Sequence, residues 1–182
     1  DKDSATVFDE DEYFITMEKA AHIEELVERH TAIMDQFDPE KRIGLIVDEW
    51  GSWYNVDPGT NQGFLYQQNT LRDALLAGVS LNVFNKHCDR VKMANIAQLV
   101  NVLQALILTE GEKMLLTPTY HVFDMYQVHH DAVLLPVNLA CGTYSRLGRA
   151  MPVISATASK DKNGAIHISF VNIDPSNEIE IS

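Results

Sequence analysis

Cysteine is scarce in this sequence of 182 residues, and the two cysteines present exclude the common zinc sites. Cys88 and Cys141 stand far apart and lack the close pairing that structural zinc sites use. Free cysteine is among the most buried residue types, so we expect two free thiols in the interior. The histidines also lack zinc-ligand spacing on one helix face, which holds for His87, His121, His129 and His130. The sequence therefore predicts no metal site.

Positive charge is also in short supply. Lysine and arginine number 14 against 26 aspartates and glutamates, which gives a net charge of -12. A chain this acidic repels phosphate backbones, so nucleic acid is excluded as a partner. A neutral ligand such as a sugar is compatible with this charge.

Long hydrophobic runs are missing as well. The longest apolar segment, residues 100–108, is interrupted by Asn101 and Gln104, so the sequence predicts no membrane span. The first residues show no secretory signal pattern, and the compartment stays open. With 46% apolar and 22% charged residues, the composition is typical of a soluble globular protein with a sizeable core.

Three segments have the periodicity or the end signals of helices. Apolar residues recur every three or four positions over residues 12–37, and this predicts a helix whose buried stripe contains Ala20, Ile23, Val27, His30, Met34 and Phe37. The sequence Asp38-Pro39 ends this helix. A second helix is predicted over residues 65–85. A third begins at Thr117-Pro118, a capping residue followed by proline, and ends near Tyr126.

The strands fall into two groups. Residues 42–50 and 90–97 are apolar runs that suit strands buried on both faces, and they are separated by a loop over residues 51–63 and the second helix. Residues 132–137, 153–159 and 165–172 predict further strands, with a hairpin turn at Lys162-Asn163-Gly164. We therefore predict two domains, residues 1–131 and residues 132–182.

The order of elements in the first part is α-β-α-β-α, which predicts an α/β fold with parallel strands and helical crossovers. Two such units are a quarter of an eight-fold barrel, which needs about 250 residues. The chain is too short to hold a whole barrel and a β domain. Either it is a smaller α/β fold or it is part of a larger one.

Both predicted parallel strands end in residues that suit sugar chemistry. The first ends in Asp48-Glu49-Trp50, and the second ends near Asn95 and Gln98. Glycoside hydrolysis needs paired carboxylates, together with amides and aromatic rings that hold the sugar. A glutamate at a strand end is also common as a capping or ion-pairing residue, so this pattern alone leaves both interpretations open.

Two longer motifs favour the catalytic interpretation. Residues 47–54, with the sequence Val-Asp-Glu-Trp-Gly-Ser-Trp-Tyr, resemble the nucleophile motif at the end of barrel strand seven in the α-L-arabinofuranosidases of glycoside hydrolase family 51. Residues 87–101, from His87 to Asn101, resemble strand eight of the same family. The resemblance extends from the first helix to about Val137, and the remaining residues resemble the start of the family's β-sandwich domain.

The resemblance implies a role for several residues. Glu49 matches the catalytic nucleophile, Gln98 matches a residue that binds arabinose, and Trp50 and Trp53 match positions near the sugar pocket. Asn95 is a further candidate for sugar binding. The family's acid/base glutamate follows a Gly-Asn pair, and no Gly-Asn-Glu occurs in this sequence. Asp48 is expected to position Glu49 or the following loop.

The resemblance therefore implies the C-terminal part of a (β/α)8 barrel followed by strands of a β-sandwich. It implies a retaining α-L-arabinofuranosidase that acts on arabinose-containing oligosaccharides or polysaccharides, without a cofactor, and that forms homo-oligomers. An isolated chain lacking the acid/base glutamate is expected to be inactive. Two alternatives remain open: another barrel glycosidase of the same clan, and a non-catalytic sugar-binding or assembly domain.

Overall fold

The N-terminal part of the chain is helical. The computed structural model describes residues 3–182, and its first elements are α1 (Glu10–Ala21) and α2 (Ile23–Phe37). The predicted single helix is thus two helices that meet at His22. Asp9 caps α1 by accepting a hydrogen bond from the Glu12 backbone N–H at 2.9 Å, and the Asp9 N–H donates to the Glu12 carboxylate at 2.8 Å. This reciprocal pair fixes where the helix begins.

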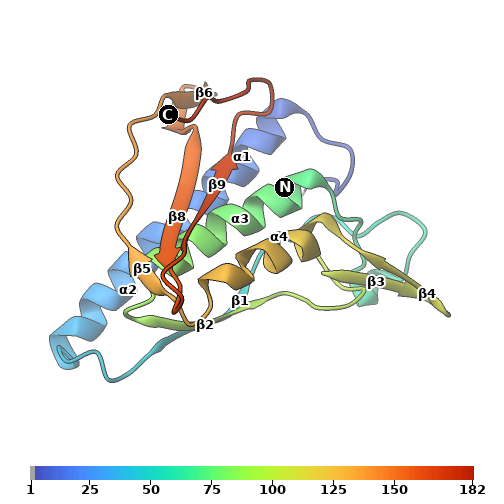
Figure 1. Ribbon diagram of the computed structural model, residues 1–182. Helices are drawn as coiled ribbons and strands as arrows, with labels where there is room; N and C mark the ends of the chain where they lie inside the picture. The colour runs from blue at the N-terminus through green and yellow to red at the C-terminus, as the bar shows by residue number, and fades with distance from the viewer. Residues whose placement is uncertain (1–2) are drawn as a thin grey trace.

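The predicted apolar stripe of this region is only partly buried. Ala20 and Val27 lie in the core, but Phe37 is 84% exposed and His30 is exposed. Figure 1 shows the reason, because the end of α2 extends away from the other elements. Periodicity located the helical region correctly, but it missed the break at His22 and misjudged how far the core follows the helices.

Two parallel strands and the helix between them form the next unit. β1 (Leu45–Trp50) and β2 (Val91–Ile96) pair in parallel, and α3 (Leu71–Lys86) connects them. Both strands and the parallel pairing agree with the sequence prediction. Buried residues of the two strands face α3 and α4 (Pro118–Tyr126), whereas the apolar Ile46 and Met93 are 43% and 54% exposed.

The connection before α3 is longer than predicted. The helix begins at Leu71 rather than at residue 65, because Thr70 and Asp73 form a capping box there. Before it, a short 3-10 helix, η1 (Gln62–Phe64), ends at Leu65, which has a left-handed backbone with φ of 55°. Leu65 therefore cannot continue a helix.

A hairpin follows β2 and was not predicted. It pairs β3 (Ile107–Glu110) with β4 (Lys113–Leu116), and Gly111 in the turn has φ of 58°. α4 then begins after Thr117, as predicted, and continues into the short η2 (Gln127–His129). The Thr117 side chain accepts a hydrogen bond from the Tyr120 N–H, which explains the start of α4.

The C-terminal part consists of strands. A three-stranded antiparallel sheet has the order β5 (Val133–Leu135), β8 (Ile154–Lys160) and β9 (Ile166–Asn172), with the predicted hairpin turn between the last two. A second hairpin, β6 (Thr143–Arg146) and β7 (Arg149–Pro152), was not predicted. Figure 1 shows β8 and β9 lying across α3 and α1.

One cluster of buried residues joins the helices to these strands. Phe14 of α1 is fully buried, and its ring meets Tyr144 of β6 edge-on with ring centres 5.3 Å apart. The Tyr13 hydroxyl donates to the Ile173 carbonyl at 2.7 Å. Ion pairs from Arg146 to Asp11 and from β7 to α1 reinforce the contact. The predicted boundary near residue 132 is therefore crossed by a continuous core.

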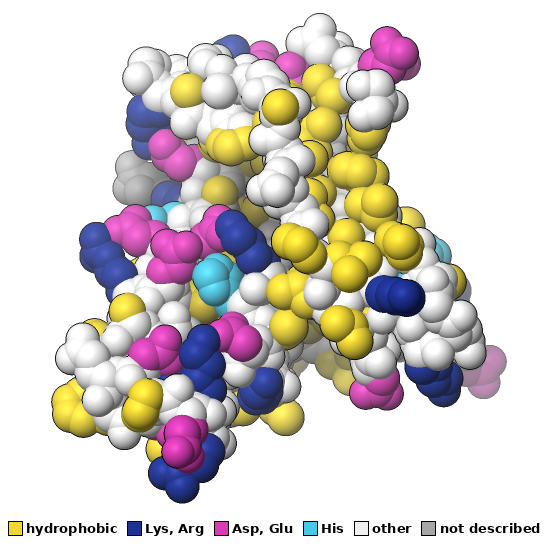
Figure 2. Space-filling view, turned by 60° about the vertical axis from the view of Figure 1, so that its left-hand side comes forward, with side chains coloured by type: hydrophobic (Ala, Val, Ile, Leu, Met, Phe, Trp, Pro, Cys, Tyr) yellow, Lys and Arg dark blue, Asp and Glu magenta, His cyan; other side chains and the backbone are white. Residues whose placement is uncertain are grey.

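The surface is uneven in polarity. Figure 2 shows a face on which apolar side chains gather beside the charged side chains of the N-terminal helices. Leu134, Val137 and Leu139 are among the exposed apolar residues of the segment that follows α4. Cys88 and Cys141 are exposed free thiols, so the prediction that both are buried is wrong. Within residues 3–182, no helix combines the length and apolar character needed to cross a membrane.

Candidate functional site

The carboxylates of the predicted motif lie at the C-terminal end of β1, where the pairing with β2 is irregular. Between two regularly paired positions, β1 has two residues, Asp48 and Glu49, where β2 has one, Asn95. An extra residue on one strand produces a bulge that redirects side chains. All three of these residues are exposed, whereas the next residue, Trp50, returns to the core.

The ends of β1 and β2 meet at one edge because the strands are parallel. The Ala97 N–H donates to the Trp50 carbonyl at 3.0 Å, which extends the pairing past the end of β2. Gln98 follows directly and is exposed. The structure thus brings Glu49, Asn95 and Gln98 to the same edge of the two-stranded sheet, as the sequence predicts.

The two tryptophans of the motif differ in environment. Trp50 is 5% exposed, with its ring stacked on Phe123 at 6.0 Å and edge-on to Phe84 at 5.3 Å. Its indole ring therefore has no open face for a sugar. Trp53, in contrast, is 50% exposed.

A buried polar network supports the loop that follows Glu49. The Ser52 hydroxyl donates to Asp73 at 2.9 Å, and the Tyr54 N–H donates to the Gln67 side chain at 2.9 Å. Burial raises the pKa of the Asp73 carboxyl, although hydrogen bonds from Thr70 and Ser52 oppose this shift. Burial also raises the pKa of Tyr54 to about 12, so its hydroxyl keeps its proton at neutral pH.

Arg72 joins the same loop to the N-terminal segment. Its guanidinium lies between the rings of Phe8 and Tyr54, 3.7 Å and 3.9 Å from their centres. It also donates to the carbonyls of Ser4 and Ala5 at 2.9 Å and 3.2 Å. A buried cation that contacts two rings and two carbonyls therefore ties the loop to the N-terminal segment.

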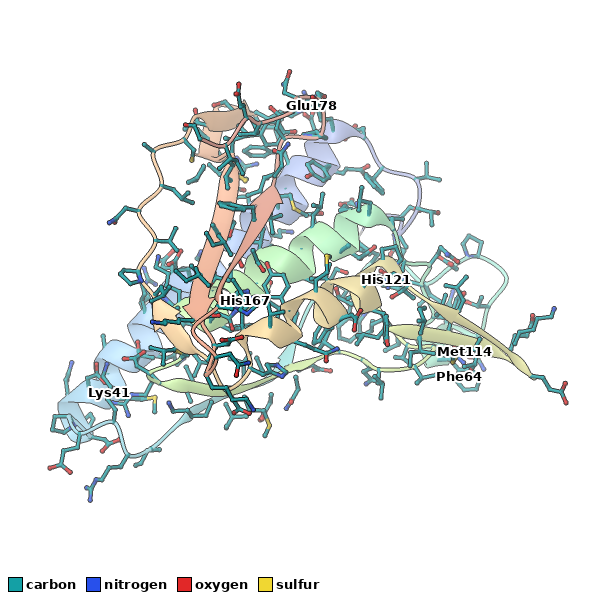
Figure 3. All side chains as sticks on the ribbon, in the orientation of Figure 1. Lys41, Phe64, Met114, His121, His167 and Glu178 are labelled. Carbon is teal, nitrogen blue, oxygen red and sulfur yellow. The ribbon has the colours of Figure 1, made fainter. Side chains whose placement is uncertain are left out.

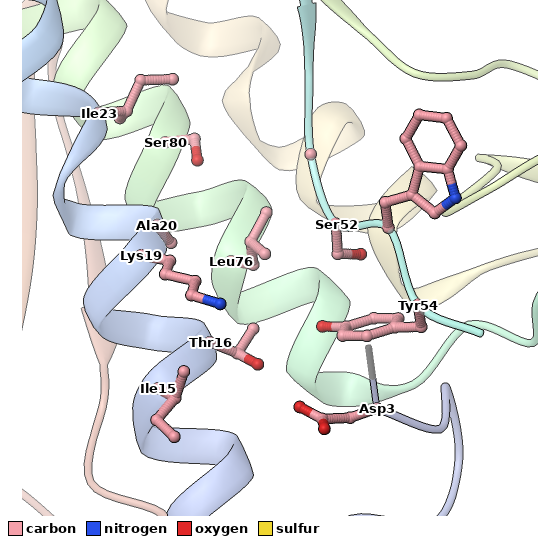
Figure 4. Close-up of a pocket in the computed structure, with 12 residues that line it drawn as sticks. Asp3, Ile15, Thr16, Lys19, Ala20, Ile23, Ser52, Tyr54, Leu76 and Ser80 are labelled. Atoms are coloured by element: carbon pink, nitrogen blue, oxygen red, sulfur yellow. The ribbon is translucent and has the colours of Figure 1, made fainter. Parts of the chain in front are cut away.

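A cavity of about 230 Å³ lies behind this loop, between α1 and α3. Figure 4 shows the Lys19 side chain and the Tyr54 hydroxyl pointing into it, with Ser52 and Thr16 at its rim. This cavity lies on the helix side of the loop.

Sequence reasoning missed most of this supporting set. Gln67, Arg72 and Gln104 are almost fully buried, and none was predicted to be functional. A signal existed for Arg72 and Asp73, because they are charged residues near the start of a largely apolar helix, two and three positions after a capping threonine. Gln104 had no comparable signal.

One group of side chains within residues 3–182 has donor atoms close enough to hold a metal ion. The donor atoms of Glu24, Glu28 and His87 lie within 4.8 Å of one another. Lys86 already forms an ion pair with Glu24, so a cation is present at this position without a metal.

Comparison with known proteins identifies the class to which this arrangement belongs. The family profile described as "Alpha-L-arabinofuranosidase C-terminal domain" matches residues 48–181. The chain is 54% identical to an intracellular exo-α-L-arabinofuranosidase of Bacteroides ovatus, over the whole of this chain and 35% of that protein. It is 28% identical to a probable α-L-arabinofuranosidase C of Aspergillus clavatus, over 75% of this chain and 28% of the relative.

Solved structures agree with this result. The glycoside hydrolase family 51 arabinofuranosidase of Xanthomonas axonopodis pv. citri matches 97% of this chain with a TM-score of 0.94 and 49% identity, and the match covers 36% of that enzyme. The Thermotoga maritima α-L-arabinofuranosidase, solved as an arabinose complex, matches 88% of this chain with a TM-score of 0.66 and 25% identity. The chain belongs to the α-L-arabinofuranosidases of glycoside hydrolase family 51 and contains their C-terminal domain. It spans about a third of the length of these relatives.

Proposed function

We propose that this chain is the C-terminal part of a retaining α-L-arabinofuranosidase. Residues 1–131 would be the last segment of a (β/α)8 barrel, with β1 and β2 as its strands seven and eight, and residues 132–182 would be strands of an incomplete β-sandwich. The exposed apolar residues Ile46 and Met93 support this, because they lie where further barrel strands would cover them. Ile166, Ile168 and Phe170 alternate along β9 and would be covered by a second sheet.

One observation carries the functional proposal: Glu49 is exposed at the C-terminal end of a strand whose parallel neighbour ends in Asn95 and Gln98. Active sites of β/α barrels lie at this end of the strands. The family membership of the chain gives this edge its chemistry. An exposed carboxylate at the same end of the sheet as two amide side chains suits attack on a sugar that is held by its hydroxyl groups.

The proposed reaction has two steps. Glu49 attacks the anomeric carbon, the bond to the leaving oxygen breaks, and a second carboxylic acid outside this sequence donates its proton to that oxygen. That carboxylate then removes a proton from water, which displaces Glu49 and releases arabinose with retained configuration. Carboxylates alone perform these transfers, so we propose no cofactor.

We assign the remaining residues to supporting roles. Gln98, Asn95 and Trp53 are proposed to contact the sugar. Trp50 is proposed as a positioning residue, since its ring is buried against α3 and α4 and fixes the end of β1 beside Glu49. The substrates would be oligosaccharides with terminal arabinofuranosyl units, such as those of arabinan and arabinoxylan. Association into a homo-oligomer is part of the proposal.

Replacement of Glu49 tests the nucleophile assignment in the full-length enzyme. We expect Glu49→Ala to abolish turnover even for aryl arabinofuranosides with excellent leaving groups, since these bypass the acid but not the attacking carboxylate. Added azide should restore some activity and give a glycosyl azide of inverted configuration. Product configuration is measured by NMR.

Asp48→Asn is the matched control. It should reduce the rate without altering the stereochemical outcome, because Asp48 supports the site rather than attacking the sugar. Near-normal hydrolysis by Glu49→Ala would show that Glu49 is not the nucleophile. An azide product of retained configuration would make Glu49 the acid/base residue instead.

A further inference from the structure

Three side chains with metal-binding chemistry meet where α2 lies beside the end of α3. Glu24 and Glu28 are four residues apart on α2, so they share one face of that helix, and His87 directly follows the last residue of α3. One donor atom from each of these side chains lies within 4.8 Å of the other two. Glu28 is exposed, whereas Glu24 and His87 are half-buried. The cluster is therefore open to an ion from solvent.

The imidazole of His87 is directed at this cluster. Its Nε2 lies 3.6 Å from a Glu24 carboxylate oxygen, which is beyond hydrogen-bond distance. The same nitrogen is buried and has no hydrogen-bond partner within residues 3–182. A buried polar atom without a partner is unfavourable unless a ligand satisfies it. In the tautomer protonated at Nδ1, Nε2 has a lone pair that can bind a cation.

Contacts near the cluster hold α2 and the end of α3 together. Lys41, in the loop after α2, forms an ion pair with Asp89, two residues after His87, and Figure 3 shows Lys41 at the outer end of α2. The next residue, Arg90, pairs with Asp38 at 2.8 Å. The backbone segments that carry the three side chains are therefore kept close by contacts that need no metal.

Lys86 competes for part of this position. Its ammonium forms an ion pair with Glu24, and the Lys86 side chain is 62% exposed. An exposed ion pair contributes little to stability, so a divalent ion can displace this ammonium and leave it in solvent. The net charge of -12 favours the arrival of a cation.

The donor atoms indicate which ion the cluster would hold. One imidazole nitrogen and two carboxylates are ligands that Zn²⁺ accepts, with a water molecule as the fourth. Mg²⁺ and Ca²⁺ prefer oxygen ligands alone. We propose that Glu24, Glu28 and His87 bind one Zn²⁺ ion, which fastens α2 to the end of α3.

The position of this site separates it from the proposed reaction. β2 begins at Val91, four residues after His87, so the site lies near the N-terminal end of that strand. Glu49 lies at the C-terminal end of the parallel strand β1. The ion would therefore stabilise the junction of the two helices and take no part in sugar cleavage. Spacing along one helix missed this site because its ligands come from two elements.

Calorimetric titration of the metal-free full-length enzyme with zinc chloride tests the proposal. We expect Zn²⁺ to bind at least about tenfold more tightly than Mg²⁺. His87→Gln and Glu28→Gln should each weaken Zn²⁺ binding at least about tenfold. Lys86→Gln should tighten it about two- to fivefold, because the ammonium no longer competes. His121→Gln is the matched control, since Figure 3 shows His121 on α4, well away from Lys41 and the end of α2.

Thermal unfolding gives a second measurement, because an ion that binds the folded state raises Tm. Zn²⁺ should raise the Tm of the wild type and of His121→Gln but not that of Glu28→Gln. Glu28 is exposed, so this variant decides the matter if His87→Gln fails to fold. Absence of Zn²⁺ binding by the wild type would overturn the proposal, and so would equal affinity in the wild type and Glu28→Gln. Equal affinity for Zn²⁺ and Mg²⁺ would also reject it, because it would indicate general attraction to an acidic surface.

Discussion

At the scale of single residues, Gly51 sets the path of the chain after Glu49. Its φ is +129°, a backbone conformation that favours glycine. A Cβ at this position would lie 1.3 Å from the Gln104 side-chain nitrogen, and Gln104 is fully buried. Both the backbone angle and the packing therefore require glycine two residues after the proposed nucleophile.

We expect Gly51→Ala to lower the free energy of unfolding by about 1–3 kcal/mol and to impair hydrolysis strongly, because the loop must move to admit the methyl group. Gly59→Ala separates the two causes, since Gly59 also has positive φ, +85°, but open space around it. Chemical denaturation and kcat of the full-length enzyme measure the difference. Equal effects of the two substitutions would show that the contact with Gln104 contributes nothing.

At the scale of secondary-structure elements, Arg90 ties the end of α2 to the start of both parallel strands. Its fully buried guanidinium donates to the Asp38 carboxylate at 2.8 Å and to the Ile43 carbonyl at 2.8 Å. Two hydrogen bonds lower the pKa of Asp38 to about 2. The larger effect comes from the Ile43 N–H and the next from the Arg90 side chain. Three elements therefore depend on one ionised carboxyl group.

The lowered pKa predicts a pH dependence of stability. The ordinary pKa of aspartate is about 3.9 in the unfolded chain, so the ionised form of Asp38 stabilises the fold above that pH. This stabilisation should be lost as pH falls from about 4 towards 2. We expect Asp38→Asn to lower Tm at pH 7, and the difference from wild type to shrink over that range.

Thermal unfolding followed by circular dichroism at a series of pH values measures this effect. Glu112→Gln, at the exposed tip of the β3–β4 hairpin, serves as the control and should follow the wild type throughout. A Tm difference for Asp38→Asn that stays constant from pH 7 to pH 2 would contradict the prediction.

The elements that sequence predicted are those with strong local signals. Thr117-Pro118 fixed the start of α4, and the β-branched run before Asp48 identified β1. The β3–β4 and β6–β7 hairpins were missed, although Gly111 and Gly148, both with positive φ, mark their turns. The start of α3 was misplaced because residues 65–69 have helical composition but are held by long-range hydrogen bonds.

The candidate site was predictable where it depends on strand ends and less so where it depends on packing. Glu49, Asn95 and Gln98 follow from the position of the strands. The burial of Trp50 depends on a bulge between Val47 and Trp50, which alternation along one strand does not reveal. The contact of Gln104 with Gly51 joins loops that are distant in sequence.

At the scale of the whole molecule, the chain provides one of the two carboxylates that the proposed reaction needs. We expect the isolated chain to have negligible activity on an aryl arabinofuranoside, because loss of a general acid alone costs about 10²–10⁴ in rate. The full-length enzyme, assayed in parallel, is the positive control. Turnover by the purified chain at rates typical of enzymes would show that its residues suffice and would reject the proposed division of the site.

The position of α3 between the two parts of the molecule has a consequence for biosynthesis. Gly78 of α3 lies so near β9 that an added Cβ would come within 2.8 Å of Val171. Because α3 leaves the ribosome well before β8 and β9, the apolar face of α3 that packs against these strands is exposed during translation. Exposed apolar surface on a nascent chain attracts chaperones and favours aggregation. Synthesis of β8 and β9, rather than of the edge that carries Glu49, is therefore the step that covers this side of α3.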